Sequence, residues 1–289
     1  MSRRNSDRVG GGSRQSSANS PAVTANQPDM AFSFVVPTEF VELPSMGKYY
    51  PEGHPLHNKD VIEIRHMTAK EEDILTSRTL LKKGVALDRL LSNIIIDKRI
   101  DPDSLLVGDR NAIIIAARIS GYGEVYETKV QCPSCMAQQK HAFDISDPHV
   151  HNGGEFVRED LSVVETEDVG FFETTLPASK IKVRFKLLTG KDEKGYLSNL
   201  EDDKKKNKTE RTVTRQLMRI IETVNDSPKF EHKKYVVENM PSKDSRYLRM
   251  AYRISAPNVD LIQNFECSEC GHAAEMEVPL SADFFWPDT

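Results

Sequence analysis

The sequence predicts an α+β fold, in which a small helical lobe precedes a split four-cysteine ribbon that carries an inserted α/β lobe. Three observations lead to this fold class. Apolar residues recur at helical spacing between residues 60 and 121. Short strand-like stretches flank two C-x-x-C pairs, at 132–135 and 267–270, which hold all four cysteines. Residues 136–266 separate the two pairs and carry strand and helix patterns of their own.

The composition is that of a folded, soluble chain. Its 289 residues are enough for a sizeable core, and 38% hydrophobic with 29% charged residues is ordinary for a globular protein. No apolar run approaches the roughly 20 residues that a membrane span needs, and no apolar stretch marks a secretory signal. A net charge of −5 argues against general affinity for nucleic acid, although it does not exclude a local basic patch.

The N-terminal part is expected to be an arm followed by extended chain. Residues 1–30 are rich in Gly, Ser, Asn and Arg and offer little to bury, so we expect a solvated, disordered arm. The alternative is a basic arm that touches nucleic acid. The following stretch, "FSFVVPTEFVELPSMGKYYPEGHPL", is punctuated by proline and glycine, which favours a strand and tight turns. Residues 61–67 should form another short strand.

The helical lobe should begin with two helices. In residues 68–84, Thr68 is the expected N-cap, Glu71 completes a capping box, and Gly84 ends the helix. Residues 86–96 repeat leucine and isoleucine at helical spacing and predict the second helix.

A third helix should follow, capped by Asp109 and ended by Gly121. Its run Ile113–Ile115 is too apolar for a surface helix, so we expect this helix to be buried.

Strands should enter and leave each C-x-x-C turn, at 124–131, 140–146, 259–266 and 273–280. The insert, 148–258, should hold strands near 171–176 and 181–188 and helices at 209–224 and 242–255, the last capped by Ser242.

The two cysteine segments form a weak internal repeat. "VQCPSCMAQQKHAFDIS" from Val130 and "FECSECGHAAEMEVPLS" from Phe265 align cysteine with cysteine, and Ser146 with Ser281. Each half reads as strand, turn and strand, and each supplies two thiolates on a tight turn. Together they predict a tetrahedral four-cysteine site. The insert would then be a folded lobe whose ends meet at the ribbon.

The ligands of this site should be Cys132, Cys135, Cys267 and Cys270, holding one structural Zn²⁺ per chain. Redox or disulfide roles are the alternatives, but a redox dithiol needs a single pair at a helix N-terminus, and a second pair would be unexplained. A catalytic zinc is disfavoured because four thiolates leave no open coordination position.

Other candidate chemistry is sparse. His54 with His57 and His149 with His151 are expected to be surface histidines rather than metal ligands, and the run at 204–208 to be a solvated charged stretch. The sequence holds no phosphate-binding glycine loop, H-E-x-x-H or G-x-S-x-G motif. No catalytic residue is therefore predicted.

The C-terminal "FFWP" places Phe284, Phe285 and Trp286 in a row. A regular amphipathic strand would alternate apolar and polar residues, so at least one of three adjacent rings should face away from the ribbon's own core. We therefore expect this tail to be a protein-docking element. The alternative is that all three rings fold back under the helical lobe.

Three stretches carry a resemblance to a known family: "LPSMGKYYPEG" (43–53), "GDRNAIIIAARISGYGEVYETKVQCPSC" (108–135) and "CSECGHAAEMEVPLSADFFWP" (267–287). They resemble the T4-type bacteriophage baseplate hub subunits and hub assembly proteins. The resemblance covers most of residues 40–287. Its motifs are fairly specific in combination, and the arm lies outside it.

The resemblance implies a non-enzymatic structural or assembly protein of a contractile-tail baseplate, acting through contacts with other hub or tail proteins. It implies a location in the host cytoplasm during assembly, and it leaves open whether the chain stays in the virion tail baseplate or acts only as an assembly factor. No small-molecule substrate, nucleic acid or membrane span is expected. The alternatives are a nucleic-acid-binding zinc-ribbon protein and a C-x-x-C thiol-redox protein. The expected divisions are the arm at 1–30, the extended segment with helical lobe and first knuckle at 31–147, the insert at 148–258, and the second knuckle with aromatic tail at 259–289.

Overall fold

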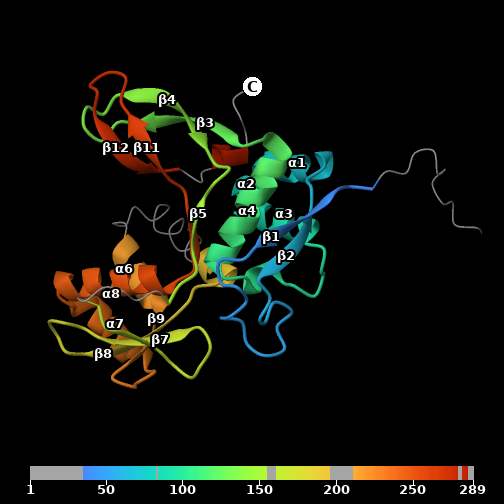
Figure 1. The fold of residues 1–289 in the computed structure, drawn as a ribbon. Helices are drawn as coiled ribbons and strands as arrows, with labels where there is room; N and C mark the ends of the chain where they lie inside the picture. The colour runs from blue at the N-terminus through green and yellow to red at the C-terminus, as the bar shows by residue number, and fades with distance from the viewer. Residues whose placement is uncertain (1–34, 83, 155–160, 196–210, 279–281, 286–289) are drawn as a thin grey trace, which may run out of the picture. The chain divides into compact units, whose positions relative to one another are not determined.

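A computed structural model describes residues 35–82, 84–154, 161–195, 211–278 and 282–285, and its ribbon is shown in Figure 1. Both α-helices and antiparallel strands are present, so the predicted α+β class is confirmed. The residues from Val36 onward belong to one compact unit with a shared hydrophobic core. The predicted arm at 1–30 and the charged run at 204–208 lie outside the described residues.

The helical lobe comes first along the described chain. A two-stranded antiparallel sheet opens it, formed by β1 (Thr38–Glu42) and β2 (Val61–Arg65). The helices that follow are α1 (Ala69–Thr76), α2 (Arg78–Lys82), α3 (Ala86–Ile94), the 3₁₀ turn η2 (Pro102–Ser104) and α4 (Val107–Tyr122).

The first predicted helix is correct at its start and wrong at its length. Thr68 and Glu71 form the expected capping box, with the Glu71 carboxylate accepting hydrogen bonds from the Thr68 amide at 2.9 Å and hydroxyl at 2.7 Å. The helix then breaks at Ser77, which has an extended backbone, so the single helix predicted for 68–84 is two helices.

The third predicted helix is buried as expected, but both of its predicted ends are wrong. α4 begins at Val107 with Leu106 as N-cap, so Asp109 lies inside the first turn and does not cap it. The helix ends at Gly123, whose φ of 85° favours glycine, rather than at Gly121.

Two antiparallel hairpins form the ribbon. The first pairs β3 (Val125–Gln131) with β4 (Gln138–Asp144), and the second pairs β11 (Ile262–Glu266) with β12 (Ala273–Glu277). A strand therefore lies on both sides of each cysteine pair, as predicted. The strand predicted for 259–266 is interrupted at Leu261, and residues 279–280 of the strand predicted for 273–280 lie outside the described residues.

The segment between the hairpins folds around its own antiparallel sheet, of order β6-β7-β8-β9. These strands are β6 (Val163–Glu165), β7 (Phe171–Thr175), β8 (Lys182–Lys186) and β9 (Ile221–Val224). The helices beside the sheet, seen with it in Figure 1, are α6 (Thr212–Ile220), α7 (Phe230–Asn239) and α8 (Ser242–Ser255).

The predicted helix at 209–224 is wrong over its last turn, because residues 221–224 pair with β8 as strand β9. α7 was not predicted. α8 has the predicted bounds, but Pro241 rather than Ser242 is its N-cap.

The two ends of this segment meet. β5 (His149–His151) pairs antiparallel with β10 (Asn258–Asp260), with Val150 opposite Val259. The pairing joins the chain that leaves the first hairpin to the chain that enters the second. The boundaries of the predicted domains stay a prediction. Across the described residues, no helix combines the length and apolar composition that crossing a bilayer requires.

Candidate metal centre

The two C-x-x-C turns have the same backbone geometry. In each, the first cysteine donates its N–H to a carbonyl five residues later and accepts, through its own carbonyl, an N–H from four residues later. The hydrogen bonds are Cys132 N to Ala137 O at 2.9 Å, Met136 N to Cys132 O at 3.0 Å, Cys267 N to His272 O at 3.0 Å, and Gly271 N to Cys267 O at 2.9 Å. The sequence repeat is therefore also a structural one.

The residue after each second cysteine has a left-handed backbone. Met136 has a φ of 62° and Gly271 a φ of 67°. This conformation turns the chain back into the outgoing strand at both sites. Glycine adopts it freely, whereas methionine adopts it against steric resistance from its Cβ.

The four sulfurs lie together. The Sγ atoms of Cys132 and Cys270 are 3.8 Å apart, and those of Cys135 and Cys267 are 3.7 Å apart. All four lie within 4.8 Å of one another. These separations far exceed the bond length of about 2.05 Å in a disulfide, so the thiols are unbonded.

This arrangement fits a tetrahedral metal ion. A Zn–S bond is about 2.3 Å, so sulfurs at the corners of a ZnS₄ tetrahedron lie about 3.8 Å apart. Two of the four distances that cross between the turns, Cys132 to Cys270 and Cys135 to Cys267, match that edge. Cys132 and Cys267 are buried, whereas Cys135 and Cys270 are exposed, so the cluster has one side in the protein and one side at the surface. The four cysteines can hold a metal ion.

The thiols influence one another's ionisation. The backbone N–H groups of Cys135 and Ser134 donate to the Cys132 sulfur and help lower its pKa to about 6. At Cys135 the Ala137 N–H lowers the pKa, but the other sulfurs, Cys270 first, outweigh it and raise the pKa to about 12. The thiolate form is therefore favoured at Cys132 and disfavoured at Cys135.

Two glutamines join the hairpins beside the cluster. The side chain of Gln139 in β4 donates to Glu266 O at 3.0 Å and accepts from the amide of Ser268 at 2.8 Å. The side chain of Gln263 in β11 pairs with both backbone groups of Asp144. Neither glutamine was predicted, because nothing in the local sequence pattern marks either one.

A buried arginine anchors the first hairpin to the helical lobe. Arg118 is fully buried in α4 and donates to three carbonyls: Phe284 O at 2.7 Å, Gly123 O at 2.7 Å and Val125 O at 3.1 Å. Burial lowers the pKa of its guanidinium. A cation inside an apolar isoleucine-rich helix was a visible signal for such a role, but one of its three partners, Phe284 O, lies 166 residues away.

The aromatic tail is only partly described. Phe284 and Phe285 are buried at 1% and 3% exposure, and Phe284 meets Tyr126 edge to face at a centroid distance of 5.1 Å. For these two rings the structure favours the fold-back alternative over docking. Trp286 lies outside the described residues, so its docking role stays a prediction.

The proline-glycine motif around residue 45 encloses a buried carboxylate. Asp109 accepts hydrogen bonds from the Ser45 hydroxyl at 2.6 Å, the Ser45 amide at 2.9 Å and the Tyr50 hydroxyl at 2.7 Å. Burial raises the pKa of Asp109 against the lowering effect of these donors, and burial also raises the pKa of Tyr50. This cluster ties the motif to α4 and explains why Asp109 does not act as a cap.

The predicted surface histidines are mostly half-buried and structural. His54 stacks on Tyr50 at 4.4 Å and hydrogen-bonds to Ser104 at 2.9 Å, and His57 contacts Tyr50 O at 2.7 Å. His149 and His151 lie in strand β5 rather than in a loop.

Comparison with known proteins gives one match. The model of the family described as T4 bacteriophage base plate protein matches residues 36–286, which include both cysteine pairs and the segment between them. No curated protein and no solved structure matches the chain.

Proposed function

The chain belongs to the T4 bacteriophage base plate protein family, and on that premise we propose that it serves the baseplate hub, as a subunit or as an assembly factor. The observation that carries the proposal is the family match over residues 36–286, which spans the whole described fold apart from Val35. The family implies a place in the virion tail and contacts with other tail proteins. The hub and a stage in the host cytoplasm are the finer parts of the proposal.

The proposal assigns one structural zinc ion to Cys132, Cys135, Cys267 and Cys270. The support is the spacing of the sulfurs and the paired geometry of the two turns. Zinc is the metal that four thiolates on two such turns favour. Its work would be to hold together two hairpins that the chain itself separates by residues 136–266.

The proposed mode of action is protein–protein contact rather than catalysis. A four-thiolate ion has no open position for a substrate, and the family is one of structural baseplate proteins. A thiol-redox role remains the rival from a different class. Titration of accessible thiols separates the two, because a metal-bound tetrad reacts only after the metal is removed.

The test combines virion proteomics with co-purification from infected cells. A hub subunit is expected at a fixed ratio to other baseplate proteins in purified virions. A pure assembly factor is expected to co-purify with baseplate intermediates while missing from virions. Failure to appear in either preparation would contradict the proposal.

A further inference from the structure

We infer that the outward side of α8 is a docking surface for an acidic segment of another tail protein, an inference that rests on the proposed function. Four exposed cations, here called the α8 basic face, define this surface: Lys243, Arg246, Arg249 and Arg253. At 100° per residue they fall within about 120° of each other around the helix. The buried residues of α8, Leu248 and Ala251 among them, lie on the opposite side.

Among the described residues, no ion pair compensates the positive charge of this face, and Asp244 is the one acid of α8 beside Lys243. None of the four cations makes an ion pair with another described residue. The one acid in α8, Asp244, is buried and accepts from the amides of Ala178 at 2.7 Å and Ser179 at 2.9 Å. The helix therefore carries +3, four cations minus Asp244, in a chain whose net charge is −5.

Such a face is unfavourable for the helix on its own. Arg246 and Arg249 are three residues apart, and Arg249 and Arg253 are four apart, so neighbouring guanidiniums repel along the helix surface. A merely solvated helix face usually alternates acids with bases. A local feature that opposes stability, with no compensating ion pair in the part of the chain that the structure describes, is typical of a functional surface.

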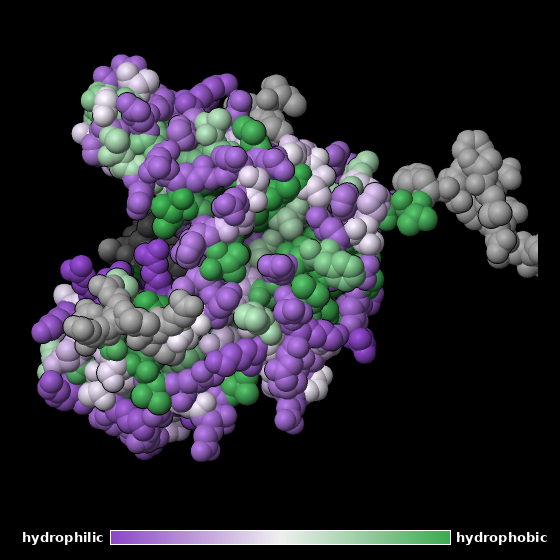
Figure 2. Space-filling view, viewed as in Figure 1, coloured by the Kyte–Doolittle hydropathy of each residue, from purple (hydrophilic) through white to green (hydrophobic). Residues whose placement is uncertain are grey.

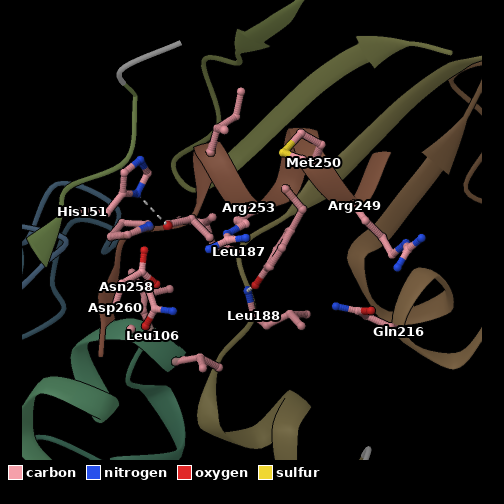
Figure 3. Close-up of a pocket in the computed structure, with 16 residues that line it drawn as sticks. Leu106, His151, Leu187, Leu188, Gln216, Arg249, Met250, Arg253, Asn258 and Asp260 are labelled. Carbon is pink, nitrogen blue, oxygen red and sulfur yellow. Dashed lines mark hydrogen bonds between the residues drawn. The ribbon is translucent and has the colours of Figure 1, made fainter. Parts of the chain in front are cut away.

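Hollows lie on both sides of the basic face. A pocket of about 600 Å³ borders Arg249 and Arg253 and has Leu187, Leu188 and Tyr252 in its wall (Figure 3). In the same view the side chains of Arg249 and Gln216 lie on the same side of the pocket.

A second hollow of about 660 Å³ borders Lys243 and Arg246, with Pro177 and Tyr247 in its wall. Met250 lines both hollows, and its flexible thioether suits an adaptable contact.

The chemistry of the face indicates its partner. Guanidiniums bind carboxylates through two parallel hydrogen bonds, and arginine is enriched at protein interfaces where lysine is depleted. On the face of the molecule shown in Figure 2, hydrophilic residues predominate among the described ones. With four exposed cations on α8, charge would supply much of the recognition. The fitting partner is a segment with several Asp or Glu residues and an apolar side chain for a hollow.

A nucleic acid fits less well. Its phosphates form an extended row and need cations over a long path, whereas these cations lie on one 14-residue helix between apolar hollows.

The test compares two charge-swapped variants with the same change of −6, three residues at −2 each. R246E/R249E/R253E alters the basic face. K70E/R89E/K234E alters exposed cations on α1, α3 and α7. The probes are the purified tail proteins of the phage, tested one at a time at low and high salt. We expect the first variant to bind its tail protein at least about tenfold more weakly and the control within about twofold of the wild type. High salt should weaken wild-type binding.

Each other outcome is informative. If the wild type binds no tail protein, the proposed function fails and this inference fails with it. If the wild type binds and both variants bind equally well, only the inference is overturned. It is also overturned if the α8 variant keeps its tail protein but loses binding to a DNA oligonucleotide or loses self-association. Melting temperatures check folding, and R246Q/R249Q/R253Q replaces the first variant if that one unfolds, with the same loss expected.

Discussion

The two hairpins that meet at the cysteine cluster share a turn geometry but differ in how they are anchored. The strands of the first hairpin, β3 and β4, bury Tyr126, Val130 and Phe143. In the strands of the second, β11 and β12, only Phe265 is buried.

The contacts outside the strands show the same difference. The first hairpin reaches the helical lobe through Arg118, which donates to Val125 O, and its Tyr126 ring meets the ring of Phe284, in the 3₁₀ turn Ala282–Phe285 that follows the second hairpin in the chain. The second reaches the first, through Gln139, Gln263 and the ring of His141, which lies 5.4 Å from that of Phe265.

Because of this difference, a bound metal ion should stabilise the second hairpin more than the first. The first hairpin buries Tyr126, Val130 and Phe143, so it should stay folded without metal. The second rests on the first and on the thiolate cluster, so loss of the metal should loosen it first. The buried residues Leu261 and Val278 lie just outside its strands and would hold only its base.

The largest effect is expected from Cys267→Ser, which removes one ligand. Loss of a structural metal belongs to the few changes that cost about 4 kcal/mol or more of unfolding free energy. Limited proteolysis should cut within residues 262–277 before it cuts within 125–144. Ser134→Ala is the control, because the Ser134 group that donates to the Cys132 sulfur is its backbone amide, and this variant should behave as wild type. Equal cleavage of both hairpins would contradict the claim that the second hairpin depends more strongly on the metal than the first.

A smaller loss, about 3 kcal/mol, is expected from Arg118→Met. Methionine fills part of the space but removes the donor of three carbonyls, of which Phe284 O is buried and Gly123 O and Val125 O are partly buried. Because the carbonyls that Arg118 binds lie outside the cysteine turns, denaturant melts should show the same loss with and without a chelator. Arg118→Lys should fall between, since one ammonium cannot reach all three carbonyls. If the loss of unfolding free energy disappears when metal is removed, the Arg118 hydrogen bonds and the cysteine cluster do not stabilise the fold independently.

The two cysteine turns differ at the left-handed residue, which is Met136 in the first and Gly271 in the second. Substitutions at these two positions should change the free energy of unfolding by about 1 kcal/mol or less. Gly271→Ala should destabilise by about 1 kcal/mol through backbone strain alone, since a Cβ there meets nothing within 4 Å. Met136→Gly should be neutral or slightly stabilising, because relief of strain offsets the flexibility of glycine. Thermal melts of both variants, with metal bound, measure the two changes in stability. Destabilisation by Met136→Gly beyond that of Gly271→Ala would reverse the expected order.

The local features of this fold were readable in the sequence. The capping box of Thr68 and Glu71 depends on residues three apart, and each cysteine turn depends on residues within six positions. The α+β class and the cysteine cluster followed from such signals, together with the repeat that relates Cys132 to Cys267.

The features that were missed depend on distant partners. Asp109 looked like a helix cap, but Ser45, 64 residues away, holds its carboxylate. Residues 221–224 continued a helical pattern, but pairing with β8 makes them a strand. Arg118 finds a carbonyl 166 residues away. Periodicity in a window of the chain carries no information about such contacts.

The smallest effect is expected from deleting residues 1–30, which belong to neither hairpin. The segment is too polar to add to a core, so the melting temperature should change by less than about 1 °C. A drop of several degrees would show that the arm packs on the folded unit and that the anchors described above are incomplete.

The most direct test of the account is the metal content of the protein, purified without added metal. Elemental analysis should find about one zinc per chain, and a chelator should release it, expose four reactive thiols and lower the melting temperature. A metal-free protein with four free thiols and a melting temperature that a chelator leaves unchanged would contradict the claim that Cys132, Cys135, Cys267 and Cys270 join the two hairpins through one zinc ion.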